Sequence, residues 1–346
     1  MTDTLIGAYE GIVCDLDGVV YRGRDAVPHA VEALEGARRA GVRIAYATNN
    51  ASRSPQEVHG QLSDLGLDLS VRDVVTSSQA GAVHLADVLP AGATVLAIGG
   101  AGVAQALQEQ GLRAVRAADV QEGGPEHGTR VEAVLQGLGT DVSWRDLAEA
   151  AFAIARGARW VATNADTTLP THQGLAPGNG ALVGVVRHAV DVDPHVVGKP
   201  EPPLYELAAR VLDTEVPRTL AIGDRLDTDL AGAVRTGMPG LYVATGVSSP
   251  RDVALVGPQE RPRYLAFDLR ALHLPYVDVE VDDSGAAICA NVRAHLRAGT
   301  LEIEGDGTPD ERLRAVVAAC WAGVDRGEDP ATIDDEVWAG LASQQS

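Results

Sequence analysis

Short apolar runs alternate with segments of helical periodicity along the first part of the chain. The apolar runs have the length of buried strands and cover residues 11–15, 42–47 and 74–75. The helical segments cover residues 33–40 and 55–65, and a glycine follows each of them. Strands that alternate with helices of this length predict an α/β fold, with a parallel sheet and helices on both of its faces.

A second series of the same kind begins near residue 80. Its predicted strands are residues 94–98, 132–135 and 160–163, and its predicted helices are residues 103–110 and 144–156. The polar, glycine-rich stretch 122–130 is typical of a loop. The first series resumes with predicted strands at 195–197, 219–222 and 241–244, separated by helices at 204–212 and 230–236. We therefore expect a core of residues 1–80 plus 187–270, interrupted by an inserted α/β domain of residues 81–186.

The pattern changes after a proline-containing connector at residues 250–275. Residues 277–281 alternate between apolar and acidic positions, as a half-buried antiparallel strand does. A turn at 282–285, a return strand at 286–292 and helices at 313–324 and 334–341 complete the series. Residues 271–346 are therefore expected to form a small α+β module.

Composition narrows the class of partner. The 346 residues include 28 Lys and Arg against 48 Asp and Glu, which gives a net charge of −20. Such a surface repels nucleic acid and anionic membranes, so neither is expected as a partner. The sequence has no basic, apolar leader and no apolar run near ~18 residues, and its three cysteines lie far apart. These features favour a cytoplasmic protein without disulfides or a zinc site.

Two carboxylates stand where the first strand ends, in Asp15-Leu16-Asp17-Gly18. At the carboxyl end of a strand in an α/β sheet, side chains face the crevice where ligands bind. Asp15 can attack phosphorus, and Asp17 can transfer protons. A turn that carries two aspartates by chance is the alternative interpretation.

Three further fragments follow other predicted strands. Thr48-Asn49-Asn50 offers a hydroxyl and main-chain N–H groups for phosphate oxygens, or simply caps a helix. Lys199, in a chain whose cations are nearly all arginine, can offset the charge of a nucleophile and a phosphoryl group, or lie in an exposed loop. Asp224, with Asp227 and Asp229 after it, suits Mg²⁺ together with Asp15, or marks a solvated acidic loop.

The four fragments, in this order and each at a strand end, resemble the haloacid dehalogenase superfamily of phosphatases over about residues 8–265. The resemblance implies a Rossmann-like core and an inserted cap like that of the p-nitrophenyl, pyridoxal and phosphoglycolate phosphatases. The stretches Ala162–Asp166 and Gly174–Gly178 are similar to part of that cap. The C-terminal extension resembles that of actinobacterial glycerol-3-phosphate phosphatases, which makes glycerol 3-phosphate the expected substrate.

The resemblance also implies a role for each motif residue. Asp15 would be the nucleophile and a Mg²⁺ ligand, and Asp17 would be the general acid and base and would give the metal its carbonyl oxygen. The phosphate would be bound by Gly18, Thr48, Asn49 and Asn50. Lys199 would stabilise the phosphoryl group, Asp224 would be the second carboxylate on the metal, and Asp229 would orient these groups. Asp227 matches no such position and is expected in solvent.

Substrate choice is expected to depend on the cap. The candidates are Asn164, Asp166, Thr171 and His172, of which Asp166 and His172 could bind hydroxyls of the leaving group. An aspartate that caps a turn and an ordinary loop histidine are the alternatives. An aromatic share of 4% fits a small polyol phosphate better than a pyridoxal ring or a nucleotide.

Other functions stay open. The alternatives for the substrate are phosphoglycolate, pyridoxal phosphate and a sugar or nucleotide monophosphate. A phosphomutase would transfer the phosphoryl group to an acceptor other than water, and a sensor would bind a phosphometabolite without turnover. The C-terminal module is interpreted as a structural module, as a fragment resembling an acyl-CoA-dependent transferase that lacks the pyrophosphate loop and so predicts no transferase activity, or as a dimerisation or regulatory module. A homodimer is therefore one expected assembly.

Overall fold

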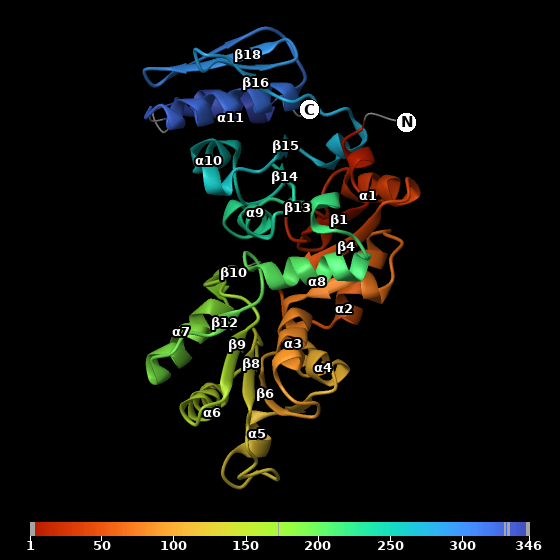
Figure 1. Cartoon of the computed structure of the whole chain (residues 1–346), viewed down its shortest axis with the longest axis vertical. Coiled ribbons are helices and arrows are strands. Elements are labelled where there is room, and N and C mark those ends of the chain that lie inside the picture. Colours follow the sequence, from red (N-terminus) through yellow and green to blue (C-terminus); the bar gives the residue numbers. More distant parts are fainter. Residues whose placement is uncertain (1–3, 172, 329, 331–332, 344–346) are drawn as a thin grey trace. The chain divides into compact units, whose positions relative to one another are not determined.

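The chain divides into two compact units. In the computed structural model, residues 4–171, 173–328, 330 and 333–343 are described. Unit 1 comprises residues 1–44 and 212–346, and unit 2 comprises residues 45–211 (Figure 1). Strand β4 (Arg43–Thr48) crosses from one unit to the other along the chain.

Unit 1 is built on parallel strands. Their order is β15-β14-β13-β1, and they are β1 (Gly11–Cys14), β13 (Thr219–Gly223), β14 (Gly240–Val243) and β15 (Tyr264–Ala266). Every residue of β1, β13 and β14 is buried, which explains why these strands are continuous apolar runs. The surrounding elements are the hairpin β2 (Tyr21–Arg22) and β3 (Asp25–Ala26), and the helices α1 (Ala30–Arg39), α9 (Ala231–Thr236) and α10 (Pro250–Leu255).

Unit 2 contains a five-stranded parallel sheet in the order β12-β9-β8-β6-β7. The strands are β6 (Thr94–Ile98), β7 (Arg113–Val115), β8 (Ala133–Gln136), β9 (Arg159–Ala162) and β12 (His195–Val196). Strand β5 (Val74–Thr76) pairs in parallel with β4, and β10 (Thr168–Thr171) forms an antiparallel hairpin with β11 (Gly174–Pro177).

The helices of unit 2 are α2 (Pro55–Asp64), α3 (Ser77–Val88), α4 (Ala101–Glu109), α5 (Ala117–Val120), α6 (Trp144–Ala155), α7 (Asn179–Val190) and α8 (Pro202–Leu212). Three of these helices, α2, α3 and α6, begin at side-chain caps that the sequence supplies. Ser54 and Glu57 cap α2 reciprocally, and Ser143 and Asp146 do the same for α6. Each box satisfies two main-chain N–H groups that the first turn leaves without a helical partner.

The expected α/β fold with a parallel-sheet core is confirmed, but one strand belongs elsewhere. Residues 195–197 were expected to resume the first series, whereas β12 pairs with β9 and extends the sheet of unit 2. The His195 ring also stacks on His84 of α3, with 4.2 Å between ring centroids. A two-residue strand carries no local signal for its partner, so the sequence pattern could not assign it. The domain boundaries 1–80 plus 187–270, 81–186 and 271–346 stay a prediction.

The C-terminal module is an antiparallel sheet covered by one long helix. Its strands β16 (Glu280–Val281), β17 (Ala287–Cys289), β18 (Val292–Arg297) and β19 (Thr300–Glu304) pair in sequence order, and its helices are α11 (Pro309–Asp325) and α12 (Asp335–Ser343). The predicted return strand 286–292 was wrong in detail. It ends at Cys289, because Ala290 takes a left-handed conformation (φ 53°) and starts a turn into β18.

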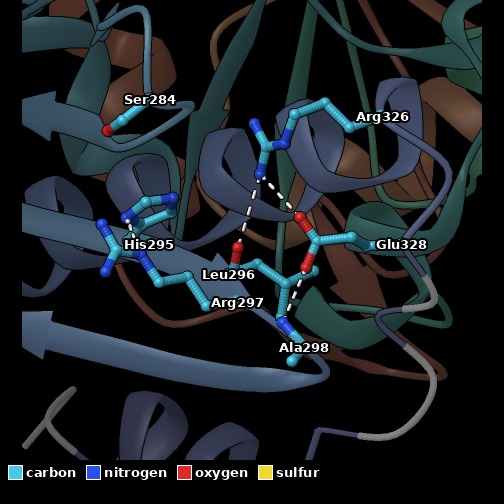
Figure 2. A pocket seen from close by; sticks show the side chains of 7 residues that line it. All are labelled: Ser284, His295, Leu296, Arg297, Ala298, Arg326 and Glu328. Atoms are coloured by element: carbon cyan, nitrogen blue, oxygen red, sulfur yellow. Dashed lines mark hydrogen bonds and ion pairs between the residues drawn. The ribbon is translucent and has the colours of Figure 1, made fainter.

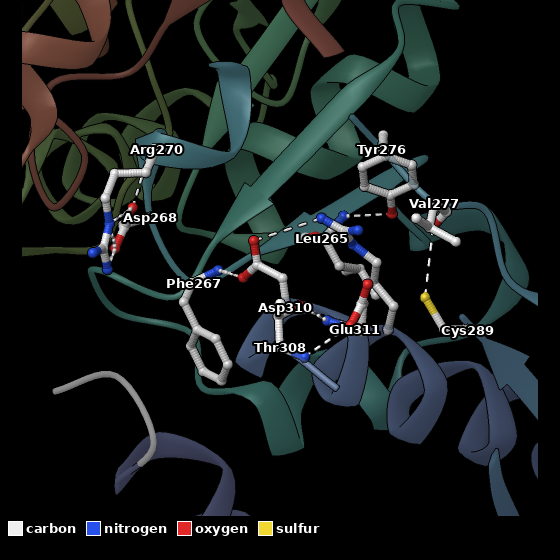
Figure 3. A network of polar contacts seen from close by, with 11 residues as sticks. Leu265, Phe267, Asp268, Arg270, Tyr276, Val277, Cys289, Thr308, Asp310 and Glu311 are labelled. Carbon is white, nitrogen blue, oxygen red and sulfur yellow. Dashed lines mark hydrogen bonds and ion pairs between the residues drawn. The ribbon is translucent and has the colours of Figure 1, made fainter. Parts of the chain in front are cut away.

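Polar contacts connect α11 to β15 and to the segment that follows it (Figure 3). The main-chain N–H of Phe267 donates to Asp310 Oδ1 at 2.9 Å, and Arg314 Nε donates to the carbonyl oxygen of Leu265 at 3.0 Å. The Arg314 guanidinium also lies 3.8 Å from the centroid of the Tyr276 ring. Burial of Asp310 raises the pKa of its carboxyl above the usual value.

One hydrophobic cluster joins the module to the rest of unit 1. It contains side chains from α11 and α12 together with residues near the parallel sheet, among them Leu226, Leu230, Tyr242, Leu313, Cys320 and Trp338. Leu226 and Leu230 lie on either side of Asp227 and Asp229 in the sequence. The C-terminal helix and the acidic loop therefore share a core.

Candidate active site

Three carboxylates come together at the carboxyl ends of two neighbouring strands of unit 1. Asp15 follows β1 and Asp224 follows β13, and the main-chain N–H of Asp15 donates to the carbonyl oxygen of Ile222 at 2.9 Å. One carboxylate oxygen from each of Asp15, Asp224 and Asp229 lies within 4.8 Å of the others. Asp15 is half-buried, whereas Asp224 and Asp229 are buried. The predicted grouping of these three residues in space is observed.

Two loops enclose the carboxylate of Asp224. The main-chain N–H of Val247 donates to Asp224 Oδ2 at 2.6 Å. Gly18 has a φ of +87°, and a Cβ atom there would lie 2.7 Å from the same oxygen. A Cβ atom at Gly246 would overlap the carboxylate. Only glycine allows both loops to approach the carboxylate this closely.

The loop at residues 245–248 is a component that the motif analysis missed. Thr245 Oγ1 donates to the carbonyl oxygen of Gly18 at 2.7 Å, and Tyr242 donates its hydroxyl proton to the carbonyl oxygen of Ser248 at 2.6 Å. Burial, and then the charge of Asp224, raise the pKa of Tyr242, so its phenol keeps that proton. The available signal was Thr245-Gly246 directly after an apolar strand, a position equivalent to that of the other motifs.

Asp229 and Asp227 have different surroundings although they are neighbours in the π-helical turn Leu226–Leu230. Asp229 accepts a hydrogen bond from the main-chain N–H of Arg225 at 3.1 Å, and a Cβ atom at Gly223 would overlap it. Asp227 is exposed and pairs with the Arg225 guanidinium, which lowers the pKa of Asp227. This agrees with the expectation that Asp227 lies in solvent.

The donor set of the cluster suits a hard divalent cation. It offers carboxylate oxygens only, two of the three side chains are buried, and glycines keep the space around Asp224 free of side chains. Mg²⁺ prefers such ligands and completes its shell with water and substrate oxygens. Asp17, two residues beyond Asp15, is exposed, so its carboxyl is accessible to a bound ligand for proton transfer.

The other predicted residues gather in unit 2 around Asn49. Its Oδ1 accepts from the main-chain N–H of Lys199 at 2.8 Å, and its Nδ2 donates to the carbonyl oxygen of Lys199 at 3.0 Å. Nδ2 also donates to Asp166 Oδ2 at 3.2 Å. A Cβ atom at Gly198 would lie 2.6 Å from Asn49 Oδ1, so a glycine must precede the lysine. The Asn49 amide therefore holds the lysine loop rather than presenting itself to a ligand.

Two residues that were predicted to select the substrate, Asn164 and Asp166, also belong to the hydrogen-bonded group around Asn49. Asn164 Nδ2 donates to the carbonyl oxygen of Asn49 at 2.7 Å, and the main-chain N–H of Asp166 donates to Asn164 Oδ1 at 3.2 Å. Asn179, which the sequence analysis did not select, donates to the carbonyl oxygen of Asn164 at 2.8 Å. Asn164 is buried, and its amide bonds to main chain, so its position favours bracing over substrate contact.

The remaining predicted residues have simpler environments. Thr48 Oγ1 accepts from the main-chain N–H of Asn50 at 3.0 Å, and Asn50 Oδ1 accepts from the hydroxyl of Ser52 at 2.7 Å. Lys199 is buried and is the only lysine of the sequence. Thr171 is exposed in the β10–β11 hairpin, and His172 lies outside the described residues.

Comparisons with known proteins identify the family. Residues 12–113 match the model of the haloacid dehalogenase-like hydrolases, and residues 196–272 match a second hydrolase model of the same kind. The chain therefore belongs to the haloacid dehalogenase-like hydrolases, and the predictions of this family and of an enzyme are confirmed. No helix among the described residues is long and apolar enough to cross a membrane.

Individual proteins are similar to this chain in sequence and in structure. It is 41% identical over 321 residues to the D-glycerol 3-phosphate phosphatase of Mycobacterium tuberculosis, covering 90% of this chain and 86% of that protein. A 5'-nucleotidase of Bacillus subtilis is 34% identical over 78% of this chain and 99% of its own length. The crystal structure of a glycerol phosphate phosphatase from Mycobacterium tuberculosis in complex with magnesium matches with a TM-score of 0.84, 37% identity and 99% coverage of both chains.

Proposed function

We propose that this hydrolase is a Mg²⁺-dependent phosphomonoesterase and that glycerol 3-phosphate is its substrate. The observation that carries the chemistry is the cluster of Asp15, Asp224 and Asp229 at adjoining strand ends. The substrate is supported by the similarity over nearly the whole chain to glycerol phosphate phosphatases. The small-molecule ester is thus the partner, while the cytoplasmic location and the homodimer stay predictions from the sequence.

Asp15, Asp224 and the main-chain carbonyl of Asp17 would hold the metal, and Asp229 would keep this arrangement in place. When bound, Mg²⁺ supplies positive charge against the phosphate oxygens. Asp15 attacks phosphorus in line, an aspartyl phosphate forms and the P–O bond to the alcohol breaks. Asp17 gives the departing alkoxide its proton and then removes one from the water that attacks the aspartyl phosphate. Free phosphate leaves, and Asp15 is regenerated.

Lys199 acts on the transferred phosphoryl group in this proposal. Its ammonium compensates charge on the phosphate oxygens and on Asp15, and Thr48, Gly18 and the main-chain N–H groups near Asn49 and Asn50 bind those oxygens. Asn49 keeps the lysine loop in one position through both main-chain groups of Lys199. The inserted segment, with Asp166 and His172, selects the leaving group.

The first test is phosphate release with Mg²⁺ from a panel of esters. The panel contains glycerol 3-phosphate, phosphoglycolate, pyridoxal phosphate, a nucleoside monophosphate, a sugar phosphate and p-nitrophenyl phosphate. We expect the highest kcat/KM with glycerol 3-phosphate, and Asp15→Asn should retain less than about a thousandth of the wild-type rate. Preference for another ester would correct the substrate and keep the chemistry. Normal turnover by folded Asp15→Asn would contradict the mechanism, and binding without release would favour a sensor.

The single lysine allows a second, independent test. An amine-reactive reagent can modify only Lys199 and the N-terminal amine, and burial of Lys199 makes its reaction slow enough to follow by peptide mass spectrometry. If Lys199 binds the phosphoryl group, inorganic phosphate with Mg²⁺ should slow its modification several-fold, with no effect on the N-terminus. Equal modification rates with and without phosphate would remove Lys199 from the mechanism.

A further inference from the structure

An open cavity lies within the C-terminal module of unit 1. It has a volume of about 370 Å³, and Figure 2 shows its lining residues Ser284, His295, Leu296, Arg297, Ala298, Arg326 and Glu328. A cavity of this size is in the range that holds small metabolites. None of these residues belongs to the motifs that the proposed phosphatase reaction uses.

The orientation of His295 is defined by its neighbour. Arg297 Nε donates to His295 Nδ1 at 3.0 Å. A guanidinium has donors only, so Nδ1 is the acceptor and the ring proton lies on Nε2. His295 is only 6% exposed, and within the described part of the chain no hydrogen bond is found for Nε2. The cavity is thus lined by a buried N–H donor whose direction Arg297 determines.

Two guanidinium groups add positive charge to the cavity. The Nη groups of Arg297 have no partner in the described ranges, and Arg326 uses its Nη2 on Glu328 Oε1 (2.9 Å) and on the carbonyl oxygen of Leu296 (3.4 Å). Glu328 spends its other oxygen on the main-chain N–H of Ala298 at 3.0 Å. The single carboxylate of the lining is therefore already bonded on both oxygens, while the arginines keep free donors.

The turn at Ser284 and Gly285 leaves room for the Arg326 guanidinium. A Cβ atom at Gly285, where φ is +84°, would overlap the guanidinium of Arg326. The neighbouring Ser284 hydroxyl donates to Asp282 Oδ1 at 2.5 Å and so offers the cavity only acceptor lone pairs. The lining thus combines donors for an oxyanion with one acceptor for a hydroxyl group.

We propose that this cavity binds a small hydroxylated oxyanion, which is a phosphate ester or a hydroxycarboxylate. The oxyanion would accept hydrogen bonds from Arg297, Arg326 and His295 Nε2–H, and a hydroxyl of the ligand would donate to Ser284 Oγ. In a chain of net charge −20, these two guanidinium groups, of which only Arg326 is paired with a carboxylate of the described residues, favour an anion that the rest of the surface repels.

The test follows the His295 imidazole resonance by proton NMR of the full-length protein. The resonance is assigned by its absence in His295→Gln and by its perturbation in Arg297→Gln, an exposed position where folding is not at risk. Inorganic phosphate or D-glycerate is titrated without Mg²⁺ at constant ionic strength set with potassium chloride. We expect a saturable shift of this resonance, and Arg297→Gln should weaken the apparent affinity about tenfold or more.

Two controls separate this site from the proposed active site and from general charge. In Asp15→Asn the His295 shift should persist, because Asp15 is not part of the cavity. Arg312→Gln, which removes a cation from α11 outside the cavity, should leave the affinity unchanged. A response to phosphate alone or to glycerate alone would identify the ligand as one of the two classes. No saturable shift, or equal losses from Arg297→Gln and Arg312→Gln, would overturn the proposal.

Discussion

The side chain of Asn49 hydrogen-bonds both main-chain polar groups of Lys199, although 150 residues separate the two in the sequence. One carboxamide thus replaces the pairing that a strand or helix would give this loop. The position of the lysine is defined by a side chain from another motif.

Replacing Asn49 by aspartate tests this relationship. The new carboxylate would keep the acceptor for the Lys199 N–H but would place negative charge against the Lys199 carbonyl and Asp166. The carbonyl oxygen of Lys199 would lose its hydrogen-bond donor at this partly buried site, which costs about 1–3 kcal/mol. We expect kcat to fall at least about tenfold with little change in KM, because Asn49 positions Lys199 and does not contact the leaving group.

The matched control is Gln105→Glu, the same chemical change in an amide that lies partly exposed on α4. Its kcat should stay within about twofold of the wild type. Steady-state kinetics of both variants on the preferred ester decides the question, and unchanged kcat in Asn49→Asp would show that the lysine loop is held by other contacts.

Replacing Gly18 by alanine should weaken the binding of Mg²⁺. An alanine there must take a left-handed φ, which costs about 1–2 kcal/mol, and its Cβ would press on Asp224 Oδ2. The Mg²⁺ concentration that gives half-maximal activity should therefore rise about tenfold or more. Gly23→Ala is the control, since Gly23 also has a positive φ (+64°) but no atom within 4 Å of the Cβ position. If both variants behave alike, backbone strain and not Asp224 is responsible.

The two aspartates that follow β13, Asp224 and Asp227, should respond differently to replacement by asparagine. Asp224→Asn removes a buried charge from the proposed metal site, and we expect activity below about one per cent of the wild type at any Mg²⁺ concentration. Asp227→Asn loses only an exposed pair with Arg225, which contributes at most about 1 kcal/mol, so its activity should be nearly normal. Rates over a Mg²⁺ titration give the comparison, with thermal melting to verify folding. Comparable losses would contradict the assignment of Asp224 to the metal.

Two aspartates of α11 should give opposite pH dependences of stability. Burial raises the pKa of Asp310, so the folded state holds this proton more tightly than the unfolded chain, and the wild type loses stability as pH rises above about 4. The Arg261 guanidinium lowers the pKa of Asp325, so this group adds stability above about pH 4 and loses it as pH falls.

Between about pH 4 and about pH 7, Asp310→Asn should therefore become more stable relative to the wild type, and Asp325→Asn should become less stable. Urea unfolding at several pH values measures both trends. Parallel trends in the two variants would mean that the Arg314 pair, and not burial, dominates at Asp310.

The acidic part of the site could be predicted because its signal is local. Asp15 and Asp224 directly follow apolar strands, and the ends of neighbouring parallel strands meet in any sheet of this kind. The support of these residues could not be predicted in the same way. Val247 contacts Asp224, and Asn49 contacts Lys199, only because tertiary packing brings distant segments of the chain together. The hydrophobic pattern of the sequence does not show which distant segments will meet.

The elements that the sequence analysis missed have weak local signals. The α7 helix begins Asn179-Gly180 and is rich in valine, which favours other conformations, and only packing makes it helical. The turn between β17 and β18 takes its positive φ at Ala290 and not at a glycine, so this break had only a weak marker in the sequence. The turn between β18 and β19 does contain a glycine, Gly299, which the sequence analysis did not use. The pairing partner of β12 was equally invisible, because a strand of two residues has almost no pattern.

The core shared by Leu226, Leu230 and the helices α11 and α12 bears on how this enzyme can be engineered. Cutting the chain before residue 276 would leave an apolar face open beneath the turn that carries Asp229. The extension is therefore part of the folding unit of unit 1. Deleting it should destabilise the protein, and transferring it to a shorter phosphatase would leave its apolar face without a partner. A large substitution on either side of this shared core therefore disturbs the packing on the other side, including the turn that carries Asp229.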